Sequence, residues 1–192
     1  MSYIYGYKTL LRRFEDRMSE AEIVKLYEWS RDPELLNLSG GSPTDLTLGE
    51  FREHLRGERL YGPSNRRMFL VLARDTQELI GRIGVFAIDW NSRDAEMGIV
   101  IGERAYWSRG YGRDAVQTLL RHLFSSSSLN TVYLITFADN LRAQRAFAAA
   151  GLRVTDRGMR FTPDVGEFEG VRMEITRREF MQLDLKQVEN QK

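Results

Sequence analysis

Hydrophobic and polar positions alternate along the whole chain in helical and strand-like patterns, with no linker between them. A Ser or Thr, followed three positions later by Glu and then by apolar residues at helical spacing, predicts helices that begin at Ser19 and Thr47. The first helix should reach about Arg31. A longer apolar stripe predicts a helix over residues 114–124, and a shorter one predicts a helix over residues 140–150.

Short runs rich in branched and aromatic residues, bounded by turn residues, predict strands. These runs cover residues 10–14, 68–73, 79–88, 97–101, 131–138, 152–161 and 168–176. The second and third should form an antiparallel hairpin, as should the last two. The strand, helix and strand from residue 97 to residue 138 form a candidate right-handed crossover. We therefore expect a single α/β (α+β) domain over residues 1–192, with a mixed, mostly antiparallel sheet.

The segment between the first two helices contains Asp32-Pro33 and the stretch Gly40-Gly41-Ser42-Pro43. Both are typical of loops, so we interpret this segment as a loop and a candidate substrate lid. The charged tail from Arg177 onward should begin as a helix.

Composition excludes several classes of function. A net charge of +1 over 192 residues provides no field for nucleic acid or an acidic membrane, and the Arg12-Arg13 and Arg66-Arg67 pairs are interpreted as surface charges. The absence of cysteine removes disulfides and thiolate chemistry, and His54 and His122 are not spaced as metal ligands. No segment approaches the roughly 20 apolar residues of a membrane span. We expect a cytoplasmic protein with no metal site.

The most informative motif is Arg109-Gly110-Tyr111-Gly112, which follows a strand-like run and opens a helical pattern. The unpaired N–H groups at such a helix start attract phosphate, and glycine lets an anion approach the main chain. A tight turn alone would also explain the glycines. A dinucleotide-binding domain would require a third glycine, which this helix lacks.

Residues 95–152 resemble the acetyl-CoA-binding core of the GNAT N-acetyltransferase superfamily. They are most similar to the branch of ribosomal-protein N-terminal acetyltransferases and spermidine acetyltransferases. The likeness is carried by the strand Ala-Glu-Met-Gly-Ile-Val-Ile, by Tyr-Trp-Ser-Arg-Gly-Tyr-Gly at residues 106–112, by the following helix, and by Asn140 and Arg142-Ala143 leading to Gly151-Leu152. Weaker similarity extends over the rest of the chain.

The resemblance implies a GNAT-like fold with two splayed central strands and acetyl-CoA bound between them as co-substrate. The residues it assigns to acetyl-CoA binding are Ile99, Val100, Ile101, Trp107, Arg109, Gly110, Tyr111, Gly112, Arg113, Asn140 and Arg142. Asn140 is equally well explained as a helix N-cap, and Arg142 as a solvated charge. Elements within residues 15–66 and 153–176 would surround the acetyl acceptor.

For catalysis, Glu96 is the candidate general base and the backbone N–H of Val100 the candidate oxyanion donor. An ion pair is an alternative explanation of Glu96. The tyrosine that often serves as general acid in the family is replaced by Phe147, so Tyr111, Tyr133 or water would have to substitute.

The resemblance implies transfer of an acetyl group to a primary amine, either a protein N-terminal α-amine or a small-molecule amine. The alternative is a catalytically degenerate acyl-CoA-binding sensor. A homodimer is possible, since members of this branch often pair. Four acidic residues could receive a cationic amine, although solvated charges explain them more simply: Glu28, Asp32, Glu34 and Asp45.

Overall fold

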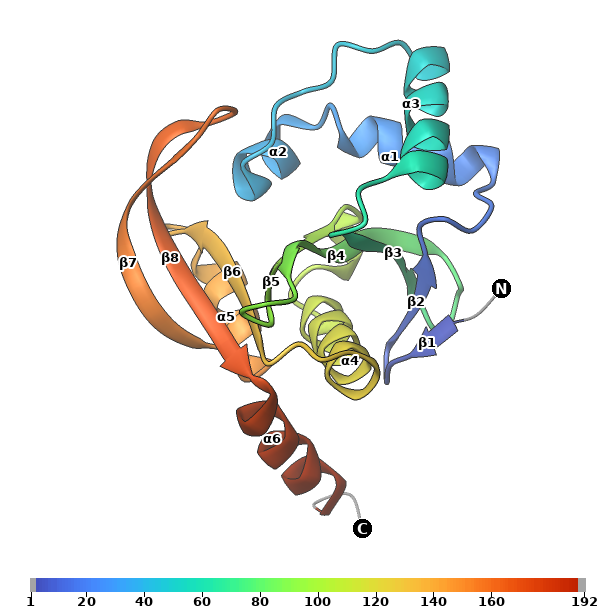
Figure 1. Cartoon of the computed structure of the whole chain (residues 1–192). Coiled ribbons are helices and arrows are strands. Elements are labelled where there is room, and N and C mark those ends of the chain that lie inside the picture. The colour runs from blue at the N-terminus through green and yellow to red at the C-terminus, as the bar shows by residue number, and fades with distance from the viewer. Residues whose placement is uncertain (1–2, 190–192) are drawn as a thin grey trace.

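The protein, described here for residues 3–189 by a computed structural model, is built around one eight-stranded sheet (Figure 1). The strands run in the order β1 (Tyr3–Tyr5), β2 (Thr9–Arg13), β3 (Arg67–Ala73), β4 (Leu79–Asp89), β5 (Asp94–Ile101), β6 (Thr131–Phe137), β8 (Gly166–Thr176), β7 (Arg153–Thr162). Neighbouring strands are antiparallel except β5 and β6, which are parallel. The mixed, mostly antiparallel sheet predicted from the sequence is confirmed.

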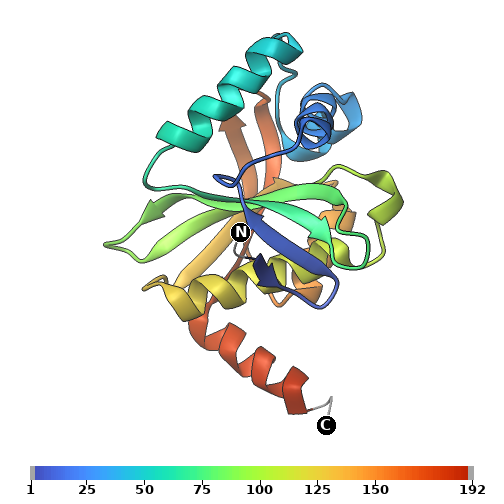
Figure 2. The ribbon, with the colours of Figure 1, turned by 90° about the vertical axis from the view of Figure 1, so that its right-hand side faces the viewer.

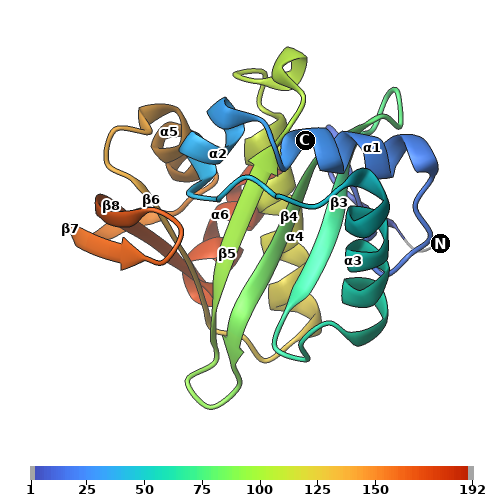
Figure 3. The same cartoon turned by 90° about the horizontal axis from the view of Figure 1, so that it is seen from above.

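Helices cover both faces of the sheet, as the side view shows (Figure 2). One face carries α1 (Glu20–Trp29), α2 (Pro33–Ser39) and α3 (Leu48–Tyr61), which lie above the strands in Figure 3. The other carries α4 (Tyr111–Ser126), with α5 (Leu141–Ala149) and α6 (Arg177–Glu189) beside it. Each face has its own core of buried apolar side chains, the larger one around α4.

Both predicted capping boxes are present and fix where α1 and α3 begin. The Ser19 side chain accepts from the Glu22 N–H while the Glu22 carboxylate accepts from the Ser19 N–H, and Thr47 and Glu50 do the same. These reciprocal bonds satisfy N–H groups that a helix start leaves unpaired.

Two elements and one charge differ from the sequence-based expectations. The predicted loop after α1 contains the short helix α2, because the Asp32 carboxylate caps its first turn and Pro33 is compatible with its first position. Strand β1 was not predicted. Arg12, expected at the surface, is buried and pairs with Glu22 at 2.8 Å.

Strands β5 and β6 separate part-way along their length. Their register contains three pairs, of which Glu96 with Tyr133 is the last, while β5 continues to Ile101 and β6 to Phe137. Beyond that pair β5 stays bonded to β4, and β6 stays bonded to β8. The predicted splay is confirmed.

Asp114, in the first turn of α4, holds the β1–β2 turn against the start of that helix. Its carboxylate accepts the main-chain N–H groups of Tyr7, Lys8 and Thr9 at 3.0, 2.9 and 2.8 Å, and the Thr9 hydroxyl at 2.7 Å. The same turn places the Lys8 ammonium 3.0 Å from the carbonyl oxygen of Arg109. The sheet edge and the glycine loop are thereby held together.

We expect Asp114→Ala to lower the free energy of unfolding by about 2–3 kcal/mol, since several donors lose a charged acceptor together. Urea unfolding followed by circular dichroism measures the change. Asp45→Ala is the matched control, because Asp45 is exposed in the loop before α3. Equal stability of the two variants would contradict the role given to Asp114.

Candidate active site

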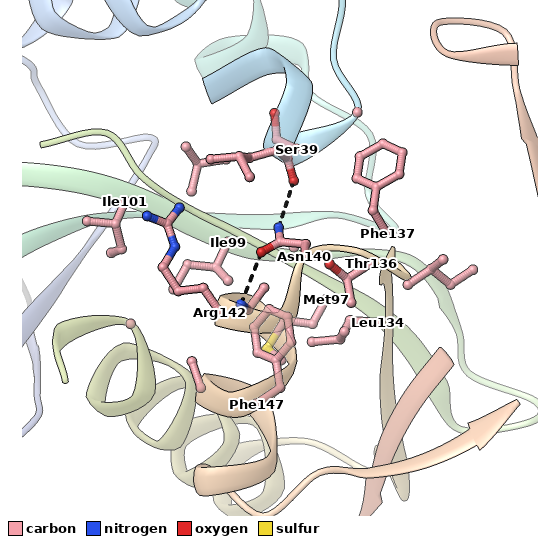
Figure 4. A pocket seen from close by; sticks show the side chains of 18 of the residues that line it. Ser39, Met97, Ile99, Ile101, Leu134, Thr136, Phe137, Asn140, Arg142 and Phe147 are labelled. Atoms are coloured by element: carbon pink, nitrogen blue, oxygen red, sulfur yellow. Dashed lines mark hydrogen bonds between the residues drawn. The ribbon is translucent and has the colours of Figure 1, made fainter. Parts of the chain in front are cut away.

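A cavity of ≈ 1060 Å³ opens where β5 and β6 part (Figure 4). Its walls come from the separated strands, the start of α4, α5, the end of α2 and the β7–β8 hairpin tip. Apolar side chains of Met97, Ile99, Leu134 and Phe147 line its inner part. The elements that meet here are the ones that the sequence assigned to cofactor and acceptor.

The start of α4 forms one wall and presents main-chain N–H groups. Gly110, the N-cap, has the left-handed φ of +85° and no side-chain cap, and the N–H of Asp114 bonds its carbonyl oxygen at 3.0 Å. The N–H groups ahead of Asp114 therefore have no intrahelical acceptor. Gly110, Gly112 and Arg113 line the cavity, so this helix start can receive an anion from it.

Trp107 and Arg142 form a stacked pair at the same wall. The indole Nε1 donates to the carbonyl oxygen of Ile101 at 2.7 Å, and the Arg142 guanidinium lies 3.7 Å from the centroid of the indole ring. Both residues line the cavity, together with Arg145 of the next helical turn. The stack gives the wall both a flat apolar surface and positive charge.

Arg109 and Tyr111 point their side chains elsewhere. The Arg109 guanidinium donates to the carbonyl oxygen of Ala105 at 3.1 Å. The Tyr111 ring is buried and packs edge-on against the Tyr106 ring, with 4.8 Å between the ring centroids. Neither is among the residues that line the cavity. The side chains of these two residues therefore do not contribute to the cavity wall.

The pairing of β4 with β5 decides which N–H groups face the open gap. The N–H of Gly102 donates to Ile80 at 2.9 Å, and bonded pairs alternate along an antiparallel ladder. By this alternation Arg82 and Val100 form a bonded pair, so the N–H of Val100 faces β4. The N–H of Ile99 faces β6, across the gap. This register favours Ile99 over the predicted Val100 as an oxyanion donor.

Asn140 is the N-cap of α5 and also ties α5 to α2. Its Oδ1 accepts from the N–H of Ala143 at 3.1 Å, and its Nδ2 donates to the carbonyl oxygen of Leu38 at 3.3 Å (Figure 4). The helix N-cap role, which the sequence analysis gave as one explanation of Asn140, is present. The bond to α2 had no signal in the sequence.

Glu96 lies half-buried at the point where β5 and β6 separate, and it lines the cavity. Burial raises the pKa of its carboxyl above the usual range, and the positive charge of Arg172 partly offsets this. No salt bridge to Glu96 is present within the described residues. A carboxyl with a raised pKa in a cavity is suited to accepting a proton near neutral pH.

The position of the missing proton donor and the nearby tyrosines differ in their access to the cavity. Phe147 is buried and lines it, but its ring has no proton to give. Tyr111 and Tyr133, named as substitutes, are not among the lining residues, and the Tyr133 ring carries the Arg172 guanidinium at 3.6 Å. Tyr106 does line the cavity, but its hydroxyl donates to Glu78 at 2.9 Å.

The segment predicted as a lid contributes to the wall of the cavity. Leu35, Leu38 and the stretch from Ser39 to Gly41 line it, and the Ser42 hydroxyl donates to the Asp164 carboxylate at 3.2 Å. This bond joins the segment to the β7–β8 hairpin. Asp32 and Glu34, considered as receivers of a cationic amine, both pair with Arg104 at 2.8 Å.

Between residues 3 and 189 no cluster of three or more His, Cys, Asp or Glu side chains could hold a metal ion. In the same range no helix has the length and apolar character needed to cross a bilayer.

Comparison with known proteins agrees with the geometry. A family model described as "Acetyltransferase (GNAT) domain" matches residues 10–153. The uncharacterized N-acetyltransferase p20 of Bacillus licheniformis is 31% identical over 134 residues, which cover 69% of this chain and 71% of p20.

Solved structures share the fold at low sequence identity. Spermidine N-acetyltransferase from Vibrio cholerae, in complex with CoA and spermine, superposes with a TM-score of 0.76 at 18% identity, covering 91% of this chain and 98% of that one. The aminoglycoside acetyltransferase AAC(6')-Ib, in complex with coenzyme A, superposes with a TM-score of 0.70 at 21% identity. The match covers 91% of this chain and 98% of that one. With three quarters of its length matched by the family model, this chain belongs to the GNAT family of acetyltransferases.

Proposed function

We propose that the protein transfers an acetyl group from acetyl-CoA to a primary amine by direct attack of the amine on the thioester. The observation that carries this proposal is the separation of β5 from β6 directly beside the uncapped start of α4. One cavity thereby joins the start of α4, which would bind phosphate, to the gap between the two strands.

The residues around the cavity fit acetyl-CoA part by part. The N–H groups of Gly110 to Arg113 would bind the pyrophosphate, supported by the positive charges of Arg113, Arg142 and Arg145. The free edge of β5, at Ile99 and at the N–H of Ile101, would bond the amide-bearing arm as an added strand does. Phe147, Met97 and Leu134 would surround the thioester with apolar atoms.

The reaction needs a neutral amine, a base for its proton and a donor to the oxyanion. Glu96 would take the proton as the new C–N bond forms, directly or through a water, and the N–H of Ile99 would stabilise the oxyanion. The C–S bond then breaks and CoA leaves as a thiolate. An α-amine, with a pKa of about 7.7–8.0, supplies far more neutral nucleophile at pH 7 than a lysine-like amine near 10.4. This favours α-amines as acceptors.

Release of free CoA in the presence of a panel of amines tests the proposal. Sustained release that depends on the amine supports an acetyltransferase. Binding of acetyl-CoA by calorimetry without any turnover would instead support the degenerate sensor, which the replacement of a proton donor by Phe147 motivates. Absence of acetyl-CoA binding would contradict both.

Phe147→Tyr is expected to raise kcat up to about tenfold at pH 6–7, because a hydroxyl would give the departing thiolate a proton. A thiolate of pKa about 8.5 needs this help less as the pH rises, so the gain should shrink above pH 8.5. The pH dependence of kcat for both enzymes measures it. Phe161→Tyr adds the same hydroxyl at a ring that is 70% exposed at the rim. An equal gain in both variants would contradict a role at position 147.

A further inference from the structure

The charges that line the cavity are strongly one-sided, although the chain as a whole has a net charge of only +1. Six arginines face one carboxylate, that of Glu96, among the described lining residues. The arginines are Arg66, Arg82, Arg113, Arg142, Arg145 and Arg160. Arg66 and Arg160 pair with carboxylates outside the lining, those of Glu58 and Asp156, and the other four arginines would repel a polycationic acceptor.

Only half of this positive charge lies where a CoA molecule would use it. Arg113 belongs to the first turn of α4, and Arg142 and Arg145 belong to α5, beside the glycine loop. Arg66 precedes β3 and Arg82 lies within β4. These two stand on the other side of the opening, under α1 to α3, where the acceptor would bind.

Arg82 shares one face of the sheet with Glu96. Along the pairing of β4 with β5, Arg82 lies opposite Val100 and Phe86 lies opposite Glu96, with the glycine pair Gly84 and Gly98 between them. Residues that lie opposite one another, and every second residue along a strand, point to the same face. Arg82 and the candidate base therefore project into the same half of the cavity.

Between Arg82 and Glu96 the floor of the cavity is apolar. The Met68 side chain occupies the space above Gly84, and the Phe86 ring occupies the space above Gly98. Both side chains line the cavity. An acceptor lying on this floor would have its amine toward Glu96 and its far end toward Arg82.

Among the described residues, the Arg82 guanidinium has no hydrogen-bond or ion-pair partner. It lines the cavity and is exposed there, and no described carboxylate lies within 4 Å of it. The negative charge that acts on it is that of Glu58, which already pairs with Arg66 at 2.8 Å. Surrounding protein lowers the pKa of Arg82; Glu58 partly offsets this and Arg66 adds repulsion. A guanidinium that lines a cavity without an ion-pair partner is available to bind the anionic group of a ligand.

Resting on the proposed acetyl transfer, we infer that the acceptor amine carries its own anionic group, a carboxylate or a phosphate, which Arg82 binds with support from Arg66. Arg82 is then a specificity-determining residue for the acceptor. A polycationic substrate would need a carboxylate in the part of the cavity that holds the acceptor. This protein has the Arg82 guanidinium there, so we expect its acceptor to differ from the polycations on which some proteins of the same fold act.

Matched probes that differ in one charged group test the inference. The carboxylate arm compares the peptide amide Ser-Glu-Ala-Ala with Ser-Gln-Ala-Ala and Ser-Lys-Ala-Ala, and the phosphate arm compares O-phosphoethanolamine with ethanolamine. Turnover is followed by CoA release, and binding of each probe to the CoA complex is followed by calorimetry. We expect the anionic member of at least one arm to show a kcat/KM or affinity at least tenfold higher. The arm that responds identifies the anion.

Variants assign the preference to one residue. Arg82→Gln should abolish the discrimination while leaving CoA affinity unchanged, and Arg82→Lys should retain part of it. Arg56→Gln is the matched control, since Arg56 is 68% exposed on α3 and outside the cavity. Preference for the neutral or lysine-containing probe, no binding of any probe, or unchanged discrimination in Arg82→Gln would overturn the inference. If the unaltered protein does not bind CoA, the proposed acetyl transfer itself is contradicted.

Discussion

Gly112→Val is expected to weaken CoA binding by about 10- to 100-fold while leaving the fold intact. A side chain at this position would stand between the N–H groups of the α4 start and the pyrophosphate. Loss of one bond to a charged group, at roughly 1.5–3 kcal/mol, corresponds to about that range. Calorimetric titration with CoA measures the affinity, and thermal unfolding measures the stability.

The environment of Gly112 makes this variant interpretable. A Cβ atom there would meet its nearest neighbour, the Ile101 side chain, at 3.8 Å, an ordinary contact, and the backbone has no left-handed φ. Gly57→Val is the matched control, because it makes the same replacement within a helix where nothing lies within 4 Å. Full CoA affinity in a folded Gly112→Val protein would contradict binding at the helix start.

Glu96→Gln is expected to lower kcat by at least about 100-fold, the lower end of what a positioned general base contributes. The pH profile provides a second readout. Because burial raises the pKa of Glu96, the active carboxylate is lost as the pH falls through a value above the usual glutamate range. The unaltered enzyme should therefore show an acidic limb in kcat at saturating amine, and Glu96→Gln should lack it.

Glu96→Gln should lower kcat without lowering the stability of the fold. A carboxyl whose pKa is raised by folding destabilises the protein as it ionises with rising pH, so Glu96→Gln should be at least as stable as the parent at neutral pH. The groups that act on this carboxyl are Arg172, which stabilises the ionised form, and the neighbouring Tyr133. Glu53→Gln, at a 68% exposed side chain on α3, is the control. A similar kcat and an unchanged acidic limb in Glu96→Gln would remove Glu96 from the mechanism.

Local signals in the sequence account for most of the fold. The capping boxes at Ser19 and Thr47 mark helix starts because their bonds form within one turn of chain. The strand before the glycine loop and the helix after it were also predicted. The sequence analysis does not predict helix α2, although Asp32-Pro33 is a valid helix start, because the glycines that follow it indicate a loop.

The site was less accessible to sequence-based reasoning, since its geometry depends on contacts between distant segments. Arg66 was interpreted as a surface charge, yet it lines the cavity beside Arg82. The choice between Val100 and Ile99 depends on the register with β4, which no local pattern reveals. The bond from Asn140 to Leu38 joins residues 102 positions apart. Which charged side chains line a cavity can be decided only when the positions of the strands and helices around that cavity are known.

A crystal structure of the protein with bound acetyl-CoA tests the central claim most directly. The account predicts the pyrophosphate oxygens within hydrogen-bond distance of the N–H groups of Gly110 to Arg113, and the amide-bearing arm lying along the free edge of β5 at Ile99. A pyrophosphate bound elsewhere, with β5 and β6 paired along their whole length beyond Glu96 and Tyr133, would contradict it.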